Sequence, residues 1–391
     1  MLRLLHTADV HLGARHTDLG DAAVAQRERQ FAAFRASVDL AIAEHADLFL
    51  VAGDLFDSNT QPRRSVERVA AELSRLVEAR IRAVLIPGTH DVYDRSSVYR
   101  AYDLPALAGS RPGDDLVTLL TPGRPWVHLG SLDVVVHGPV FATKRAPYSP
   151  LRDIASVETP AATWKVGLLH AAVAIPGRTD GDEVVVTTDE IAASGLDYLA
   201  LGHWHSAQVA RAKGVTWAYA GAPEPVAVDQ DRAGKVLLVT LDDGKGSRSV
   251  VVEERTVGRT TFERLDLDAA TVGSQPALVT RLRGAANPDL VLDVRLTGVR
   301  PDDLDLVPGE VEEALRGQFL RLRVRDTSRP ALSDGALPPP ETIAGAFIRD
   351  VEGRIAALEG SGDTAAAREA DELRDVLRLG RLLLAGHEVT L

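Results

Sequence analysis

Short runs of consecutive apolar residues recur along the first 240 residues, and most end in glycine or a polar residue. The run at 48–52, for example, is followed directly by Gly53 and Asp54. An apolar run of this length predicts a strand buried on both faces, as in the parallel sheets of α/β proteins. The predicted strands cover residues 2–10, 48–52, 82–87, 165–170, 198–202, 215–219 and 235–240, with shorter candidates at 116–120, 126–129 and 132–137.

Two segments between these runs carry apolar residues at helical spacing. Residues 21–46 place Phe34 and Val38 on one face of a helix. A second helix is predicted over 62–80, because Pro62 suits the first turn of a helix. Each helix joins two strands, so the pattern predicts consecutive β-α-β units in one large α/β domain.

The pattern changes after about residue 256. The later elements are predicted as β-like runs at 277–282, 290–296 and 319–324, with a helix at 309–317. Prolines then mark a linker, and helical spacing returns beyond it. The predicted domains are 1–255 (α/β), 256–328 (small α+β), 329–341 (linker) and 342–391 (helical tail). The tail either binds a partner or folds back on its own domain.

Composition narrows the class of protein. The 391 residues include no cysteine, which excludes disulfides and thiolate metal sites and suits the cytoplasm. An apolar leader and an unbroken stretch of 18 apolar residues are both absent, so we expect neither secretion nor membrane insertion. The formal net charge of −12 argues against wrapping nucleic acid by bulk electrostatics, but it leaves room for local contacts.

Side chains suited to metal binding follow several predicted strands. Asp54 comes directly after the run at 48–52, at the edge where open α/β sheets bind ligands. One carboxylate can bridge two divalent ions through its two oxygens, so Asp54 is the expected centre of a two-metal site. Asp9 and His11 lie two residues apart after the first strand. In an extended segment they would point the same way and reach one ion.

Each of these features alone has an ordinary structural explanation. A strand-terminal aspartate more often caps a helix than binds a metal. The prediction depends on the whole set in a fixed order, with each motif at the end of an apolar run. The five motifs are Asp9-x-His11, Gly53-Asp54-x-x-Asp57, Gly88-x-His90-Asp91, His170, and Gly202-His203-x-His205. Because chance assembly of this series is improbable, we predict a metal site.

This ordered set resembles the calcineurin-like metallophosphoesterase superfamily over roughly residues 1–240. Within it, the segments around Asp9 and Asp54 look most like the nuclease subunit of the bacterial SbcCD complex and its double-strand-break repair relatives. The resemblance implies an α/β fold, a β-sandwich flanked by helices, with the small α+β domain capping the nuclease domain. It also implies that the tail, 342–391, binds the coiled-coil base of an SMC-like ATPase.

The resemblance also implies the ligand set. The first metal would be held by Asp9, His11, Asp54 and His205, and the second by Asp54, His170 and His203, with Thr89 completing the set. His90 would act as the acid at the leaving oxygen, and Asp91 would orient His90. Mixed imidazole and carboxylate ligands suit Mn²⁺, Fe or Zn²⁺ better than Mg²⁺, and nucleases of the family use Mn²⁺. Two such ions support in-line displacement on a phosphodiester.

Thr89 departs from the family pattern, which has asparagine at this position. A threonine hydroxyl is shorter than the amide and a weaker donor. Thr89 either ligates the second metal, directly or through a water, or leaves that site empty except at high metal concentration. The first alternative gives an active enzyme with a looser second site, and the second gives a weak or inactive nuclease. We favour retained activity, because every other ligand and His90 are present.

The sequence is compatible with three functions. The first is a Mn²⁺-dependent DNA exonuclease or endonuclease subunit that works with an SMC-like ATPase in DNA repair. The second is a phosphoesterase for a small substrate such as a cyclic nucleotide, which the negative charge favours and the additional domain and tail disfavour. The third is a non-enzymatic scaffold whose tail docks a partner. The family commonly forms homodimers, so we also expect a homodimer.

Overall fold

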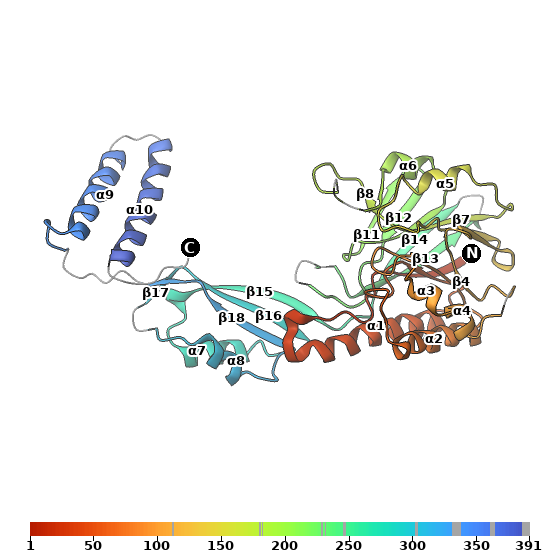
Figure 1. The fold of residues 1–391 in the computed structure, drawn as a ribbon, viewed down its shortest axis with the longest axis horizontal. Helices are drawn as coiled ribbons and strands as arrows, with labels where there is room; N and C mark the ends of the chain where they lie inside the picture. The colour runs from red at the N-terminus through yellow and green to blue at the C-terminus, as the bar shows by residue number, and fades with distance from the viewer. Residues whose placement is uncertain are drawn as a thin grey trace. The chain divides into compact units, whose positions relative to one another are not determined.

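The computed structural model describes residues 1–384 except 112, 180, 182, 228–229, 231, 245–247, 302–303, 331–337 and 360–363. The chain divides into two compact units, and Figure 1 labels their elements in chain order. The first unit comprises Met1–Arg264, Asn287–Leu292 and Gly317–Arg321. The second comprises Leu265–Ala286, Asp293–Arg316 and Leu322–Leu391.

The first of two six-stranded sheets contains the N-terminal strand. Its order is β14 (Ser249–Thr256), β13 (Lys235–Asp242), β1 (Leu2–Thr7), β2 (Leu48–Ala52), β3 (Arg82–Ile86) and β4 (Val117–Leu119). Strands β1 to β4 are parallel, and β13 and β14 extend the sheet antiparallel. The parallel strands therefore deliver the residues that follow them to one edge of the sheet.

The second sheet repeats this arrangement. Its order is β11 (Gln208–Ala212), β12 (Val215–Tyr219), β10 (Tyr198–Gly202), β7 (Trp164–His170), β6 (Val134–His137) and β5 (Trp126–Leu129). The four inner strands are parallel, and the two edge strands are antiparallel. Two short parallel strands, β8 (Ala172–Val173) and β9 (Val185–Val186), form a separate pair.

The two sheets pack face to face, because alternate residues of each inner strand point to opposite faces. Leu50 of β2 shares a buried apolar cluster with Val166 and Leu168 of β7. Phe49 and Val51, the alternate residues of β2, belong to a different cluster on the outer face. Both faces of β2 are thus buried, which accounts for its uninterrupted apolar sequence.

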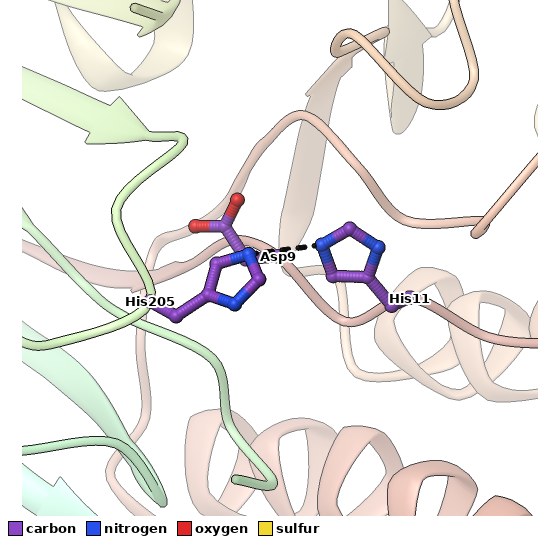
Figure 2. A group of neighbouring side chains, drawn as sticks. All are labelled: Asp9, His11 and His205. Carbon is purple, nitrogen blue, oxygen red and sulfur yellow. Dashed lines mark hydrogen bonds between the residues drawn. The ribbon is translucent and has the colours of Figure 1, made fainter. Parts of the chain in front are cut away.

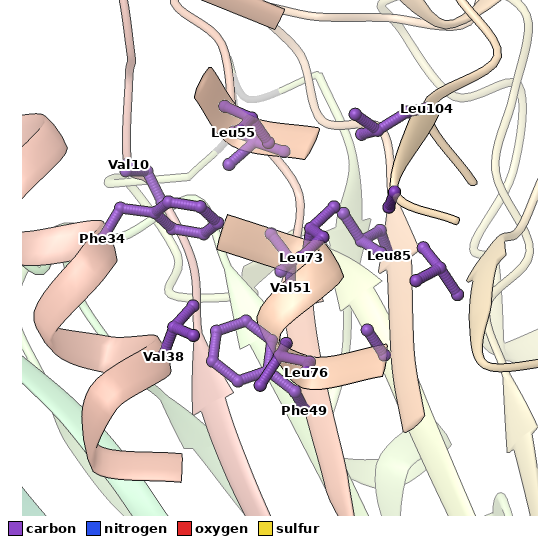
Figure 3. Packing of buried hydrophobic residues seen from close by; sticks show 14 of the residues in the cluster. Val10, Phe34, Val38, Phe49, Val51, Leu55, Leu73, Leu76, Leu85 and Leu104 are labelled. Atoms are coloured by element: carbon purple, nitrogen blue, oxygen red, sulfur yellow. The ribbon is translucent and has the colours of Figure 1, made fainter. Parts of the chain in front are cut away.

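Helices cover the outer faces of both sheets. They are α1 (Ala23–Ala43), α2 (Arg63–Glu78), α3 (Val98–Ala101), α4 (Leu104–Leu107), α5 (Leu151–Ser156) and α6 (Thr188–Ala193). Figure 3 shows Phe34 and Val38 of α1 and Leu73 of α2 packed with Phe49 and Val51. On the second sheet, α5 and α6 contribute to the outer cluster. The predicted α/β fold, a β-sandwich flanked by helices, is confirmed.

The second unit contains most of a three-stranded sheet in the order β15 (Thr261–Asp268), β16 (Leu290–Thr297) and β18 (Arg321–Asp326). Its first helices are α7 (Gln275–Arg283) and α8 (Pro308–Ala314), and β17 (Val299–Arg300) pairs with β19 (Arg329–Pro330). Alternate residues of β16 are buried, including Leu292 and Val294. This is the α+β composition that the sequence predicts for the region.

The predicted strand at 277–282 is wrong, because these residues belong to helix α7. Ser274 caps the helix by accepting a hydrogen bond from the Ala277 backbone N–H at 3.3 Å. Leu278 and Leu282, four residues apart, are both buried on one face of the helix. A six-residue segment with four apolar residues does not distinguish a short helix from a strand, and the serine cap decides for the helix here.

The tail is helical where the structure describes it, in α9 (Ile343–Glu359) and α10 (Thr364–Leu384). The two helices form a pair in which Glu352 and Arg381 make an ion pair at 2.6 Å. A Cβ at Gly380 would collide with the Phe347 ring, so the glycine permits close packing. Part of the predicted linker (331–337) and of the tail (360–363, 385–391) lies outside the described residues. Across the described helices, none is long and apolar enough to cross a membrane.

Candidate metal centre

The turns after β1 and β2 hold three of the predicted ligands in an unusual backbone conformation. Asp9, His11 and Asp54 have φ angles of 51°, 49° and 50°. This left-handed region costs a residue with a Cβ about 1–3 kcal/mol, and such strain concentrates at functional sites. Backbone hydrogen bonds between the two turns hold it, including Asp9 N–H to Gly53 O at 3.2 Å. Asp9 and His11 therefore converge through a strained turn, and not through the extended alternation that we expected.

The first ligand group consists of Asp9, His11 and His205, whose donor atoms lie within 4.8 Å of one another (Figure 2). His11 Nε2 and His205 Nε2 are 3.1 Å apart. Asp9 and His11 come from the turn after β1 in the first sheet, and His205 follows β10 in the second. Two imidazole nitrogens aimed at each other beside a buried carboxylate suit a shared cation.

The second ligand group consists of Asp9, Asp54 and His170. His170 Nε2 lies 3.1 Å from Asp54 Oδ2. The other ring nitrogen, Nδ1, is 2.9 Å from the Ala52 carbonyl oxygen and must donate to it, since a carbonyl only accepts. Nε2 is buried without a hydrogen bond of acceptable geometry in the described structure. An imidazole fixed through Nδ1 and left with Nε2 available is the usual arrangement of a metal ligand.

Asp54 connects the two groups. Its Oδ2 lies 3.8 Å from His11 Nε2 and 3.1 Å from His170 Nε2, so one oxygen faces an imidazole of each group. Its Oδ1 accepts the His90 backbone N–H at 2.8 Å. Asp54 thus lies between the two sets of donors and faces both with one oxygen, and not with the two oxygens that we expected.

Thr89 and His203 lie at the edge of these groups. Thr89 Oγ1 is 3.5 Å from Asp54 Oδ2, at the limit of a hydrogen bond. The His203 ring centroid is 5.4 Å from that of His170, and the His203 backbone N–H donates to Asp9 Oδ1 at 2.9 Å. His203 does not join any of the donor groups found among the described residues.

His90 lies at the open side of the site, with 45% of its side chain exposed. Its ring packs edge-on against His11, with centroids 4.7 Å apart. His90 Nδ1 donates to the Asp57 carbonyl oxygen at 3.0 Å, which leaves Nε2 for solvent or substrate. Asp57, rather than Asp91, is therefore the residue in hydrogen-bond contact with the His90 ring.

Asp91 is fully buried and fixes the loop that carries His90. Its carboxylate accepts the Gly88 backbone N–H at 2.7 Å, the Phe56 backbone N–H at 3.1 Å and the Tyr99 hydroxyl at 2.6 Å. The Phe56 bond ties the turn after β3 to the turn after β2, and the other two hold Asp91 to its own turn and to helix α3 (Val98–Ala101). In the structure Asp91 thus acts on the backbone beside His90.

The buried charges of the site shift one another's pKa values. Burial raises the pKa of Asp9 to about 6, although the neighbouring His170 opposes the shift. Burial would lower the pKa of His170, but the charge and contact of Asp54 outweigh it and raise the value to about 10. Burial, and then the charge of His11, lowers the pKa of His205 to about 3. A divalent cation would replace the proton that these groups otherwise share, so the donor set fits such an ion.

Sequence reasoning missed three contacts of the site. Asp57 Oδ1 lies 3.3 Å from His11 Nδ1, and its place in the Gly-Asp-x-x-Asp motif was a signal that could have identified it. Gln230 Nε2 lies 2.6 Å from His205 Nδ1. Nothing in the sequence around Gln230, or around Tyr99 near Asp91, distinguishes them from ordinary polar residues.

Comparison with known proteins agrees with this geometry. Residues 2–207 match the calcineurin-like phosphoesterase family. The DNA double-strand break repair protein Mre11 of Aeropyrum pernix is 29% identical over 289 residues, which are 70% of this chain and 65% of that protein. A subunit of the nuclease SbcCD of Rhodobacter capsulatus is 26% identical over 387 residues, which are 88% of this chain and 91% of that protein.

Other matches are more distant or shorter. The Mre11 protein of Saccharolobus solfataricus is 30% identical, with 57% of this chain and 55% of that protein covered. The chain thus spans less than two thirds of these two Mre11 proteins. Among solved structures, TT1561 of Thermus thermophilus has a TM-score of 0.40 at 12% identity, covering 66% of this chain and 99% of that one. Because the family match covers more than half of the sequence, including all of the predicted ligands, the chain belongs to the calcineurin-like phosphoesterase family.

Proposed function

We propose that this chain is a DNA nuclease subunit that hydrolyses phosphodiesters with two divalent ions, and that both ions are Mn²⁺. The observation that carries the proposal is the convergence of Asp9, His11, Asp54, His170 and His205 from the edges of two sheets. The relatives named as a break-repair protein and as a nuclease subunit support DNA as the substrate.

In this proposal the two ions share Asp54. The first is held by Asp9, His11, Asp54 and His205, and the second by Asp54, His170, His203 and Thr89. When bound, the ions supply an activated water and stabilise charge on the phosphate oxygens. The chain itself orients the donors, through the Ala52 carbonyl at His170 and through the strained turns at Asp9 and Asp54.

His90 is the proposed general acid. Its Nδ1 is engaged by the Asp57 carbonyl, so the exposed Nε2 can carry the proton that the leaving oxygen needs. Asp91 is a positioning residue, because it contacts the backbone of the loop and not the His90 ring.

The direct test is Mn²⁺-dependent cleavage of end-labelled single- and double-stranded DNA. We expect the wild type to cut, His90→Ala to lose most of the rate and Thr89→Asn to cut faster. His128→Ala, a partly exposed histidine on β5 outside the ligand groups, serves as the matched control. Cleavage of a chromogenic phosphoester but of no DNA would contradict the proposal and favour a small-substrate phosphoesterase. Cleavage by Thr89→Asn alone would favour a scaffold.

We also propose that residues 342–391 bind an SMC-like coiled-coil ATPase, beyond a linker at 329–341 and a small domain at 256–328. The described part of the tail leaves Ile343, Val376 and Leu383 exposed, which supports a partner-binding role. Deleting 342–391 should abolish binding of the ATPase and spare DNA hydrolysis. Loss of both would contradict a separate tail.

A homodimer is also part of the proposal, and sedimentation velocity tests it.

A further inference from the structure

A cavity of about 330 Å³ lies in the first unit, and none of the residues of the proposed reaction lines it. Three aromatic side chains line it, Trp126, Phe141 and Tyr148, together with His137 and Asp153. The rings of Phe141 and Tyr148 meet edge to face, with centroids 5.3 Å apart. Tyr148 also donates to Asp153 at 3.2 Å, which holds its ring in place.

The sheet explains why these residues gather. Trp126 on β5 and His137 on β6 are direct cross-strand partners, so their side chains lie side by side on one face. Val136 points between the two sheets, and His137, the next residue, therefore points to the outer face. Helix α5, which carries Asp153, contributes to the outer layer of this sheet.

His137 is the unexplained group of the cavity. It is only 4% exposed, no hydrogen bond to it is found among the described residues, and its ring nitrogens are not among the fully buried unpaired atoms, so they face the cavity. Burial, with the charge of Lys165, lowers its pKa to about 4, so the ring is neutral and offers one donor and one acceptor. A ligand with a polar edge could therefore pair with His137 from within the cavity.

The aromatic cavity has a neighbouring cavity at the ligand groups. A smaller cavity, of about 30 Å³, is lined by Thr89 and His170, and it shares Pro139, Val140 and Phe141 with the larger one. The shared wall follows β6, which is parallel to β7, so it lies at the same sheet edge as His170. The aromatic cavity and the cavity at Thr89 and His170 thus lie on either side of this shared wall.

We propose that the aromatic cavity binds one unpaired nucleobase of the strand whose phosphate lies at the metal centre. The inference rests on the proposed function and specifies how the substrate is held. A base has a planar face for the aromatic side chains and an edge with donors and acceptors for His137. A purely apolar ligand would leave His137 unsatisfied. A phosphate would meet Asp153, and none of the described lining residues is lysine or arginine.

The test uses a single-stranded oligonucleotide with one 5-iododeoxyuridine, which photocrosslinks to aromatic side chains in contact with the base. The full-length protein is irradiated with Ca²⁺ in place of Mn²⁺, and adducts are mapped by mass spectrometry. We expect adducts at Trp126, Phe141 or Tyr148. Trp126→Ala and His137→Phe should reduce them about tenfold, as expected for loss of a stacking or edge contact. His128→Phe, the matched histidine on β5, should leave them unchanged.

The outcomes separate the inference from the proposed function. If the protein cuts DNA but crosslinks only outside the cavity, the base site is wrong and the nuclease proposal stands. If it cuts no DNA, the nuclease proposal fails, and calorimetric titration with thymidine tests the cavity alone. Absence of thymidine binding, or equal binding by His137→Phe, would overturn the site. Circular dichroism melting shows whether Trp126→Ala is folded, and His137→Phe provides a second variant.

Discussion

The two ligand groups of the metal centre differ in the strength of their donors. The first group combines a carboxylate with two imidazoles whose Nε2 atoms are 3.1 Å apart. The proposed second site relies on Asp54 and His170, on the Thr89 hydroxyl 3.5 Å from Asp54, and on His203, which lies outside the donor groups found among the described residues. In the proposed arrangement, the two sites around the shared carboxylate would therefore differ in affinity.

The backbone of the loop that carries Thr89 cannot move closer to Asp54. A Cβ at Gly88 would collide with Asp54 Oδ1, so the backbone already lies as close to Asp54 as packing allows. Asp91 fixes the same loop through the Gly88 N–H. Because the backbone is held, the reach of the side chain at position 89 determines how complete the second site is. A longer amide would extend further than the hydroxyl.

The largest expected effect is that of removing the shared carboxylate. Asp54→Ala should lose both ions and reduce DNA cleavage about a thousandfold or more, because metal catalysis supplies several kcal/mol of stabilisation. Metal content by mass spectrometry and the cleavage rate test this. Asp39→Ala, on the surface of α1, is the control. Two ions retained by Asp54→Ala would show that the groups do not share a ligand.

Removing His90 should affect the rate without affecting either ion. His90→Ala should slow cleavage about a hundredfold or more, the usual contribution of a general acid, while both Mn²⁺ affinities stay at the wild-type values. Single-turnover cleavage and Mn²⁺ titration measure the two properties separately. His90 also lies in a third donor group with His11 and Asp57, so a parallel loss of metal binding would mean that it serves as a ligand.

Restoring the longer amide should strengthen the weaker site alone. Thr89→Asn should raise the affinity of that site about tenfold, a change of the size seen when ligands and their supports are altered. The stronger site should not change. Thr89→Val, which has the same shape without the hydroxyl, should weaken the second site further. Identical titrations for all three proteins would exclude a ligand role for position 89.

The smallest expected effect is a difference between the two sites in how their metal affinity depends on pH. A metal must displace any proton bound to its ligands, so affinity rises with pH until the ligand is deprotonated. His170 has a pKa raised to about 10, and Asp9 one raised to about 6. The second site should therefore gain affinity, up to about tenfold per pH unit, well above pH 7. There Asp9 no longer contributes to the slope of the first site, and only His11 still does, since against its burial Asp57 and Asp54 raise its pKa. Equal slopes at pH 6–9 would contradict this.

The sequence predicted the layers of the fold because buried parallel strands leave long apolar runs. It failed where an element is too short to show a period. Helices α3 and α4 have four residues each, and the six-residue run at 277–282 turned out to be part of helix α7. Such short segments fit a strand or a helix equally well until a cap or a tertiary contact decides.

The site was predictable where its residues end strands and not where it depends on contacts distant in the sequence. Asp9, Asp54 and His170 stand directly beyond or at the end of apolar runs, so the topology places them at one edge. Gln230 reaches His205 from a loop 25 residues away in the chain. The left-handed φ angles of Asp9 and His11 also could not be predicted, because the pattern of apolar and polar residues does not depend on them.

Two unequal metal sites around Asp54 would be seen in a calorimetric titration of the metal-free wild type with Mn²⁺, with anomalous diffraction to locate each ion. We expect two ions. The tighter should lie among Asp9, His11 and His205, and the weaker beside His170 and Thr89. A single bound ion at saturation, or two ions of equal affinity, would show that the sites are not built as proposed.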